Sequence, residues 1–144
     1  MSKDVLAIAS DHAGVEMKAL VKGELEAMGF AVTDLGTHGT NSVDYPDFAD
    51  ALAAAIKSGK ASKGVLICGT GIGISIAANR HRHIRAALCH DSASARLSRA
   101  HNNANVLALG ARLIGPESAR DCVRAFFTTA FDGDRHQRRV DKLS

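Results

Sequence analysis

The sequence is 144 residues long, the size of one domain with one hydrophobic core, and 46% of its residues are hydrophobic. The formal net charge of +3 suits an anionic substrate. We therefore expect one domain over residues 1–144. With no tryptophan and one tyrosine, the sequence lacks the aromatic platforms that bind single-stranded nucleic acid, so we expect no nucleic-acid partner.

Five short apolar runs predict the strands of a parallel sheet that is covered on both faces, because their apolar residues are nearly continuous rather than alternating. In chain order the runs are Val5–Ser10, Ala31–Asp34, Gly64–Cys68, Ile84–Cys89 and Val106–Leu109. The N-terminal lead and the first run are together too short for a signal peptide or a membrane span. We therefore expect a cytoplasmic protein without a membrane partner.

Amphipathic helices separate the strands, and their apolar residues recur at helical spacing over 17–28, 48–56 and 119–130. Gly29 and Gly59 follow the first two helices, and Pro116 begins the last. This alternation predicts an α/β protein: a single-domain, three-layer α/β/α Rossmann-like fold with a five-stranded parallel sheet. No strand follows Arg135–Leu143, so we expect a C-terminal helical extension.

Polar residues follow every predicted strand. In chain order they are Asp11-His12, Asp44-Tyr45-Pro46-Asp47, Cys68–Ser75, His90-Asp91 and Gly110-Ala111-Arg112. Ligands of open α/β sheets bind outside the carboxyl ends of the strands, where these residues meet. The sequence therefore predicts a ligand site at this edge.

The glycine-rich run Gly69–Ser75 predicts an anion-binding turn, because small residues let backbone N–H groups approach a ligand at the start of a helix. The run has no lysine, which excludes a nucleoside-triphosphate loop. Ile74 stands where a dinucleotide fingerprint needs glycine and where a cysteine phosphatase needs arginine. Asp91 lies at the distance of a ribose-binding carboxylate, so a non-catalytic nucleotide-binding module remains an alternative, as does a tight turn without a ligand.

Cys68 ends a predicted strand and precedes a predicted helix start, an environment that favours a thiolate. Such a group can act as a nucleophile or as a general base, and packing is the competing interpretation. Cys89 and Cys122 are more consistent with packing. Three cysteines make no disulfide framework, and no Cys-x-x-Cys spacing or other ligand cluster indicates a metal site.

Three further groups admit two interpretations each. Asp11 with His12 can move a proton or bind a hydroxyl, but Asp11 can also cap a helix. The segment 101–105 can bind sugar hydroxyls or only form a turn, and it enters its strand at the opposite end, which indicates a role in a neighbouring subunit's site. The basic face formed by residues 135, 138, 139 and 142 can bind phosphate, nucleic acid or only water. We expect Arg80–His83 to form a surface loop.

Seven short motifs together resemble ribose-5-phosphate isomerase B, a family that also includes allose-6-phosphate and galactose-6-phosphate isomerases. The motifs cover essentially the whole chain: Asp11–Gly14, Asp44–Asp47, Cys68–Gly73, Ile84–Ala87, His101–Val106, Gly110–Arg112 and Gly133–His136. The resemblance implies an aldose–ketose isomerase of a phosphorylated sugar, with ribose 5-phosphate the first expectation and an allose, galactose or tetrulose phosphate the alternative. It implies no cofactor and no metal. It also implies a homodimer, sometimes a tetramer, whose sites draw residues from both subunits.

The resemblance also implies the role of each residue. Cys68 is the base that moves a proton between C2 and C1, because Ser75 stands where some members carry a glutamate base. Thr70 assists near the reacting oxygen, while Asp11 and His101 open the sugar ring. The remaining residues bind substrate: Tyr45 near the sugar, the turn residues Gly69, Gly71, Ile72, Gly73 and Ser75 at the enediolate, Asn102 at a hydroxyl, and His12, Arg112, Arg135, His136 and Arg139 at the phosphate.

Overall fold

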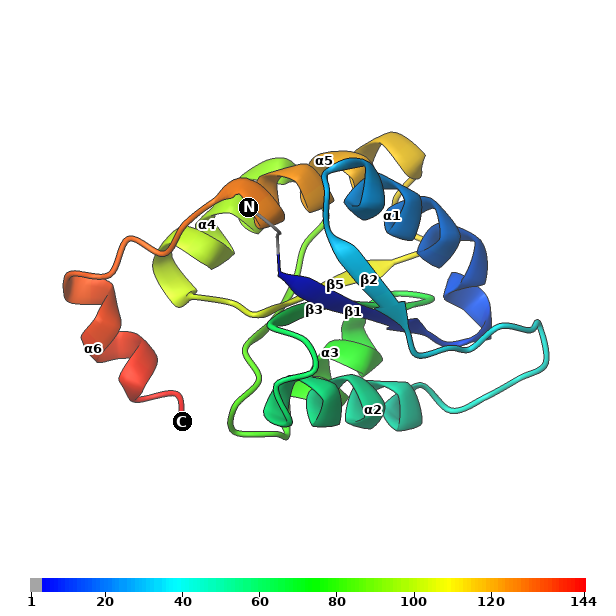
Figure 1. Cartoon of the computed structure of the whole chain (residues 1–144), viewed down its shortest axis with the longest axis horizontal. Helices are drawn as coiled ribbons and strands as arrows, with labels where there is room; N and C mark the ends of the chain where they lie inside the picture. The colour runs from blue at the N-terminus through cyan, green and yellow to red at the C-terminus, as the bar shows by residue number, and fades with distance from the viewer. Residues whose placement is uncertain (1–3) are drawn as a thin grey trace.

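The computed structural model describes residues 4–144, where five strands alternate with helices (Figure 1). The strands are β1 (Val5–Ser10), β2 (Ala31–Asp34), β3 (Lys63–Cys68), β4 (Ala86–Leu88) and β5 (Val106–Gly110). The α-helices are α1 (Val15–Ala27), α2 (Tyr45–Lys57), α3 (Ile72–Asn79), α4 (Ser92–Asn102), α5 (Pro116–Thr128) and α6 (Arg135–Asp141), with a short 3-10 helix at His12–Gly14. Residues 1–3, the start of the N-terminal lead, lie outside the described residues.

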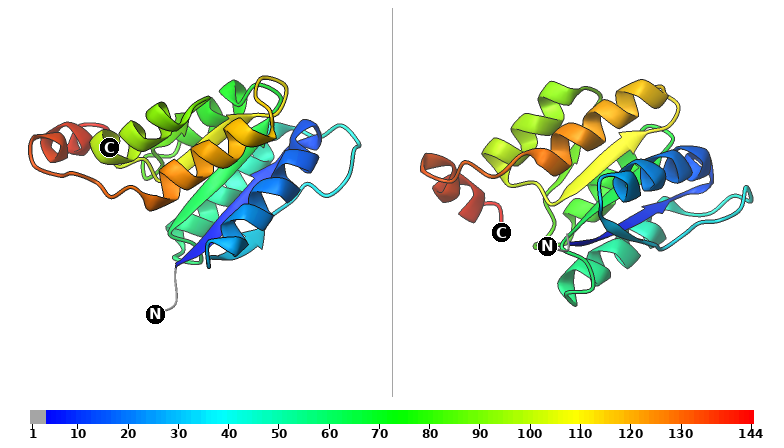
Figure 2. Two further views of the ribbon diagram at one scale, coloured as in Figure 1. Left: turned by 90° about the horizontal axis from the view of Figure 1, so that it is seen from above. Right: turned by 45° about the horizontal axis from the view of Figure 1, so that its top comes forward.

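The five strands form one parallel sheet in the order β2-β1-β3-β5-β4. Helices α1, α4 and α5 cover one face of this sheet, and α2 and α3 cover the other (Figures 1 and 2). The predicted three-layer Rossmann-like fold is therefore confirmed. From β1 the chain continues outward to β2 on one side and later to β3 on the other, so the carboxyl ends of β1 and β3 form the topological switch point.

Two hydrophobic cores hold the layers together. Leu6, Ile8 and Phe126 belong to the core under α1, α4 and α5, while Leu66 and Ile74 belong to the core under α2 and α3. Burying one such side chain contributes about 1.5–3 kcal/mol. Because the central strands β1, β3 and β5 are buried on both faces, they form a rigid base for the residues at their ends.

The edge strand β4 is shorter than the predicted Ile84–Cys89, since only Ala86–Leu88 pair with β5. The Asn105 side chain replaces the ladder before Ala86: its Oδ1 accepts from the N–H of Arg85 at 2.7 Å, and its Nδ2 donates to the carbonyl of His83 at 2.9 Å. The Asn105 side chain therefore holds this part of the chain together with backbone hydrogen bonds from the N–H groups of Asn105 and Val106 to the carbonyl of Arg85.

The predicted polar turn over 101–105 is wrong in its first two residues, because His101 and Asn102 continue α4. Asn103 caps the helix in a left-handed conformation with φ of 47°. Its N–H donates to carbonyl oxygens of the last turn, those of Ser98 and Arg99. The segment does enter β5 at the amino end of the sheet, as expected.

The predicted C-terminal extension is confirmed as α6, which stands beside the end of α4 and away from the sheet (Figure 2). A hydrogen bond of 3.0 Å from the N–H of Asp132 to the carbonyl of Ala100 ties its entry to α4. Among the helices of residues 4–144, none combines the length and the apolar character needed to cross a bilayer.

Candidate functional site

An open depression of about 350 Å³ lies at the carboxyl ends of β1 and β3, the switch point of the sheet. This volume is within the range of small-molecule sites. Its lining consists entirely of residues that the sequence singled out: Asp11, Tyr45, Cys68, Gly69, Thr70, Ile72, Gly73 and Arg112. The structure thus brings together eight predicted site residues from four loops.

The glycine turn is pressed against the end of β5. Gly71 has a φ of 76°, and an added Cβ there would lie 2.6 Å from Leu88 Cδ1 and 2.8 Å from the backbone of Leu109. An added Cβ on Gly110 would lie 2.5 Å from the carbonyl oxygen of Thr70. Only glycine fits both positions, because neither the conformation of Gly71 nor the backbone contact of Gly110 leaves room for a side chain.

The turn presents backbone donors to the depression. The first intrahelical hydrogen bond of α3 runs from Ser75 N–H to Gly71 O, and the earlier N–H of Ile72 donates to Thr70 Oγ1 at 3.2 Å. The first N–H groups of a helix lack intrahelical acceptors and carry the positive end of its dipole. The predicted anion-binding character of this turn therefore has a structural basis.

Ser75, expected to bind substrate, does not line the depression. Its side chain is buried under the first turn of α3, where its Oγ donates to the carbonyl of Ile72 at 2.8 Å. Its position one turn into the helix explains the difference. In this structure the side chain of Ser75 supports the turn.

Cys68 lies at the tip of β3 and lines the depression, although only 4% of its surface is exposed. Its Sγ accepts a hydrogen bond of 3.2 Å from the N–H of Gly71. The sulfur is therefore directed at the anion-binding turn. Cys68 also belongs to the core under α2 and α3, so its placement is compatible with both the catalytic and the packing interpretation.

The other two cysteines belong to the hydrophobic core. Burial raises the pKa of the Cys89 thiol, and burial together with the neighbouring Cys89 raises the pKa of Cys122 to about 12. Both are therefore protonated thiols at neutral pH with no opening to solvent. Their predicted packing role is confirmed.

Asp11 and His12 each use one side-chain atom to shape the backbone. Asp11 Oδ1 accepts from the N–H of Ala13 at 3.0 Å, so the predicted helix cap is present. His12 Nδ1 accepts from the N–H of Val43 at 3.2 Å. Because Nδ1 accepts, the proton of a neutral His12 ring is on Nε2, which can donate to a ligand.

Arg112 and Tyr45 each lie against a different glycine of the turn. The N–H of Arg112 donates to Gly69 O at 2.8 Å, and its guanidinium lies so close to Gly69 that an added Cβ would be 3.4 Å from Nη1. The Tyr45 ring lies against Gly73, where an added Cβ would be 2.6 Å from Cζ. The depression is therefore lined by both a cation and a phenol.

The remaining predicted residues form a second group at the other end of the sheet: His101, Asn102, Arg135, His136 and Arg139. The rings of His101 and His136 stack with their centroids 4.4 Å apart and their planes at 14°. Burial, together with Arg135, His101 and Arg139, lowers the pKa of His136, so that this ring is neutral at pH 7. Strand β5 separates this group from Cys68 by roughly 15 Å or more, at about 3.3 Å per residue.

Asp132, which sequence reasoning missed, lies beside the two stacked rings. Among residues 4–144, His101, Asp132 and His136 form the one group whose possible ligand atoms all lie within 4.8 Å of one another. A zinc–nitrogen bond lies in the plane of the imidazole ring and is about 2.0–2.1 Å long. Since the rings are nearly parallel, their lone pairs do not point to a common ion, and the group is not a preformed metal centre.

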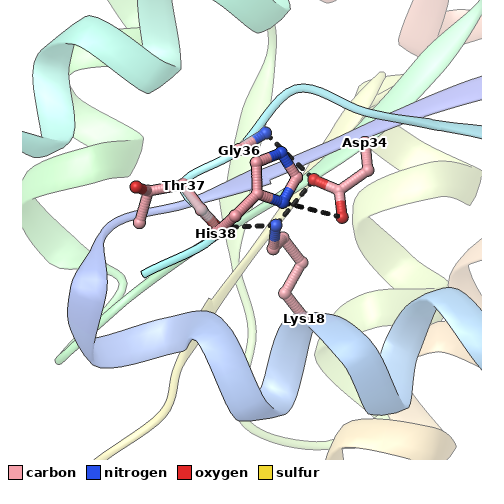
Figure 3. A network of polar contacts seen from close by, with 5 residues as sticks. All are labelled: Lys18, Asp34, Gly36, Thr37 and His38. Carbon is pink, nitrogen blue, oxygen red and sulfur yellow. Dashed lines mark hydrogen bonds and ion pairs between the residues drawn. The ribbon is translucent and has the colours of Figure 1, made fainter. Parts of the chain in front are cut away.

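Sequence reasoning also missed the buried ion pair beside the β2–α2 loop (Figure 3). Lys18 Nζ donates to Asp34 Oδ1 at 2.6 Å and to Thr37 O at 2.7 Å, and Gly36 N–H donates to the same Asp34 oxygen at 2.9 Å. Burial raises the pKa of Asp34, but the hydrogen bonds from Lys18 and Gly36 outweigh it and hold that pKa below its usual value. A lysine in an amphipathic helix usually faces solvent, so its spacing carried no signal of this role.

The fold and the depression define an α/β protein of the Rossmann-like class with a ligand site at the switch point of its sheet. Comparisons with known proteins make this more specific. The profile of the family described as Ribose/Galactose Isomerase matches residues 6–143. The solved ribose-5-phosphate isomerase B of Clostridium thermocellum superposes with a TM-score of 0.95 at 50% identity, over 96% of this chain and 94% of that one.

Two sequence relatives are similar over almost their full lengths. Ribose-5-phosphate isomerase B of Escherichia coli is 43% identical over 96% of this chain and 93% of its own length. D-erythrulose-4-phosphate isomerase of Pectobacterium atrosepticum is 45% identical over 96% of this chain and 91% of its own length. The chain therefore belongs to the ribose/galactose isomerase family, and it is an isomerase.

Proposed function

We propose that this isomerase interconverts the aldose and ketose forms of a phosphorylated sugar, with ribose 5-phosphate and ribulose 5-phosphate as its natural pair. The observation that carries the proposal is the Cys68 sulfur, which lies in the depression beside the start of α3. Isomerisation needs a base and an oxyanion site at adjacent atoms, because removing a proton next to a carbonyl produces an enediolate.

Cys68 is the base in this proposal. Its thiolate takes the proton from C2 of the open aldose, and the C–H electron pair becomes the C1–C2 double bond while the carbonyl oxygen gains the negative charge. The hydroxyl proton on O2 passes to the negative oxygen on C1, the thiol returns its proton to C1, and the C1–C2 double bond gives way to a carbonyl at C2. No electron acceptor or metal enters this balance, which supports the expectation that the enzyme needs no cofactor.

The anion-binding turn stabilises the enediolate. The N–H groups of Gly73 and Ile74 are in the first turn of α3, where no intrahelical acceptor competes for them. Thr70 Oγ1 accepts from Ile72 N–H, so its own O–H remains available to donate to the reacting oxygen. Removing one oxyanion donor typically lowers the rate by about 10²–10³-fold.

A homodimer with shared sites completes the proposal. His101 and α6 lie far from Cys68 in one chain, although both groups are needed for ring opening and phosphate binding. The exposed side chains of Ile72 and Ile76 follow the depression along α3, at 48% and 54% exposure, and provide an apolar surface that a second copy can bury. In this arrangement Asp11, His12 and Arg112 of one subunit face the second group of its neighbour, and two dimers can assemble into a tetramer.

A substrate panel tests the reaction and the substrate together. We expect the purified protein, with a chelator present, to convert ribose 5-phosphate faster than four-carbon and six-carbon sugar phosphates. A preference for erythrose 4-phosphate would assign the protein to the four-carbon substrates, as named for the Pectobacterium relative. Tight binding of ATP or NAD with no turnover of any sugar phosphate would support a nucleotide-binding module instead.

The role of Cys68 is tested by its replacement with alanine. We expect Cys68→Ala to lower kcat by about 10³-fold or more, because it removes the base, while substrate binding measured by calorimetry persists. Cys122→Ala is the matched control, since it makes the same change in the core and should retain turnover after correction for folded protein. Loss of binding in Cys68→Ala with normal turnover per bound substrate would show that the thiol is not the base.

The remaining expectations belong to the same proposal. A sugar-phosphate isomerase without a membrane or nucleic-acid partner works in the cytoplasm, where its phosphorylated substrates are found. If sugar-phosphate turnover is unchanged in excess DNA, nucleic-acid binding through the arginines of α6 has no part in the function.

A further inference from the structure

One buried side chain, Arg99, joins the end of α4 to the end of α5. It is 6% exposed. Its Nη1 donates to Asn103 Oδ1 at 2.9 Å and to Ala104 O at 2.7 Å, and its Nε donates to Thr129 O at 3.2 Å. Its guanidinium carbon lies 5.9 Å from the centre of the Phe126 ring. Arg99 therefore holds two segments that are about thirty residues apart in the chain.

Arg99 has no carboxylate partner within residues 4–144. Burial lowers its pKa, and the neighbouring cation Arg85 lowers it further. Burying a cation beside another cation is costly, and here that cost is offset by neutral oxygens and by the Phe126 ring rather than by a carboxylate. An apolar side chain would fill the space without the penalty, so what the guanidinium adds is its set of directed hydrogen bonds.

The segments that Arg99 holds carry the second group of site residues. His101 follows it by two positions and stacks on His136, and the N–H of Asp132 donates to Ala100 O at 3.0 Å. Asn103 follows Asn102 directly and caps the end of α4. Its side-chain oxygen accepts a hydrogen bond from Arg99, and its carbonyl oxygen accepts one of 2.8 Å from the Nε of Arg85. The end of α4 and the entry to α6 therefore share one anchor.

We propose that Arg99 is a positioning residue, which sets the place of His101 against His136 by fixing the end of α4 to the end of α5. The inference rests on the proposed function, in which His101, Asn102 and α6 complete the site of a neighbouring subunit. Arg99 itself touches no substrate and acts through these residues.

Two variants weaken the anchor without changing the charge of the protein. Arg99→Lys keeps the positive charge but loses the planar fork. Asn103→Gly keeps a residue suited to the left-handed conformation but removes one acceptor of that fork. Arg96→Lys is the matched control, because Arg96 is exposed on the same helix. Thermal unfolding reports whether each variant is folded.

The first measurement needs no substrate. Imidazole NMR signals of His101 and His136 report the stacked rings through their ring-current shifts and the inter-ring nuclear Overhauser effect. We expect both features to be weakened in folded Arg99→Lys and Asn103→Gly and unchanged in Arg96→Lys. Wild-type imidazole signals in Arg99→Lys and Asn103→Gly would overturn the inference.

The second measurement separates positioning from general stability. Ribose 5-phosphate must open a furanose ring, whereas erythrose 4-phosphate cannot form one because its 4-oxygen carries the phosphate. A displacement of 1 Å can cost about 10²-fold, so we expect Arg99→Lys to lower kcat/KM by about 10- to 100-fold for ribose 5-phosphate and by less for erythrose 4-phosphate. Equal losses that follow the folded fraction would make Arg99 merely structural. If wild-type protein turns over neither sugar, the proposed function fails, and the NMR comparison still decides the role of Arg99.

Discussion

Gly71 and Gly73 belong to the same turn, but we expect them to serve different purposes, protein stability and substrate binding. A Cβ added to Gly71, which has a positive φ, would meet backbone atoms of Leu109, whereas the nearest atoms to one added to Gly73 belong to the side chain of Tyr45, a residue that is 39% exposed. A backbone contact cannot relax without moving β5, but an exposed tyrosine can rotate away. A side chain at position 71 should therefore affect the stability of the protein, and one at position 73 should affect substrate binding.

Gly71→Ala should destabilise the protein by about 2–4 kcal/mol, the sum of a left-handed non-glycine residue and an overlap in a packed region. Gly73→Ala should unfold close to wild type but raise KM, because it displaces Tyr45 from the rim. Chemical denaturation and steady-state kinetics measure the two effects. Equal stabilities for the two variants would show that the turn tolerates side chains at both positions.

Arg139 lies on the basic face of α6, on which the proposed phosphate site depends. Arg139→Ala should raise KM for the sugar phosphate about tenfold or more with a smaller change in kcat, because it removes a charge-assisted contact to a part of the substrate that does not react. Arg96→Ala, which removes an exposed arginine from α4, is the control. An unchanged KM in Arg139→Ala would place the phosphate elsewhere.

Most candidate site residues could be predicted because they follow strands directly. The apolar runs of the central strands showed where those strands end. Cys68 and Asp11 are examples. The buried roles of Lys18 and Arg99 could not be predicted, since their partners are backbone oxygens and a carboxylate brought close only by folding. A single sequence carries no signal for such contacts.

The β2–α2 loop depends on the ion pair of Lys18 with Asp34, which holds its first residues, while Val43 near its other end donates to His12. Lys18 is 3% exposed and Asp34 is 20% exposed at the side chain, so solvent weakens their attraction only partly. Removing the ammonium leaves the carboxylate with the Gly36 N–H and with the exposed His38 ring, whose Nδ1 lies 4.0 Å from Asp34 Oδ2. Lys18→Met should therefore lower the free energy of unfolding at pH 7 by about 1–3 kcal/mol.

The pH dependence of this loss follows from the lowered pKa of Asp34. A carboxyl whose pKa is lower in the folded state stabilises the protein above its unfolded pKa and loses that contribution as the pH falls through the folded pKa. The difference in unfolding free energy between wild type and Lys18→Met should therefore be constant above about pH 5 and shrink below about pH 4. Urea denaturation from pH 7 to pH 3 measures it, with Lys22→Met as the control. A difference that grew on acidification would contradict the ion pair.

Strands and amphipathic helices were predicted well where a buried face dictates the pattern, as in β1, whose predicted bounds Val5–Ser10 match the structure. Prediction failed at α4, because its last turn is built from polar residues and its end depends on the left-handed conformation of Asn103. It also failed at β4, where a side chain from Asn105 replaces part of the ladder. Both errors lie where a polar contact rather than hydrophobic spacing decides the structure.

In the proposed dimer, each chain would contribute two half-sites from opposite ends of its sheet. The first contains Cys68, Thr70 and the anion-binding turn, and the second contains His101 and the basic face of α6. The helix α6 stands apart from the sheet, as Figures 1 and 2 show, and this suits a segment that completes a neighbour's site. The isologous contact of a twofold dimer would join each half-site with the opposite half-site of the partner.

Mixing two inactive variants tests this shared site most directly. Cys68→Ala and His101→Ala subunits, carrying different tags, are refolded together, and the mixed dimer is purified through both tags. Each mixed dimer then has one site with both original residues and one with neither. We expect each variant alone to be nearly inactive and the mixed dimer to regain about half of the wild-type activity per dimer with ribose 5-phosphate. A mixed dimer as inactive as its parents would contradict a site built from Cys68 of one subunit and His101 of the other.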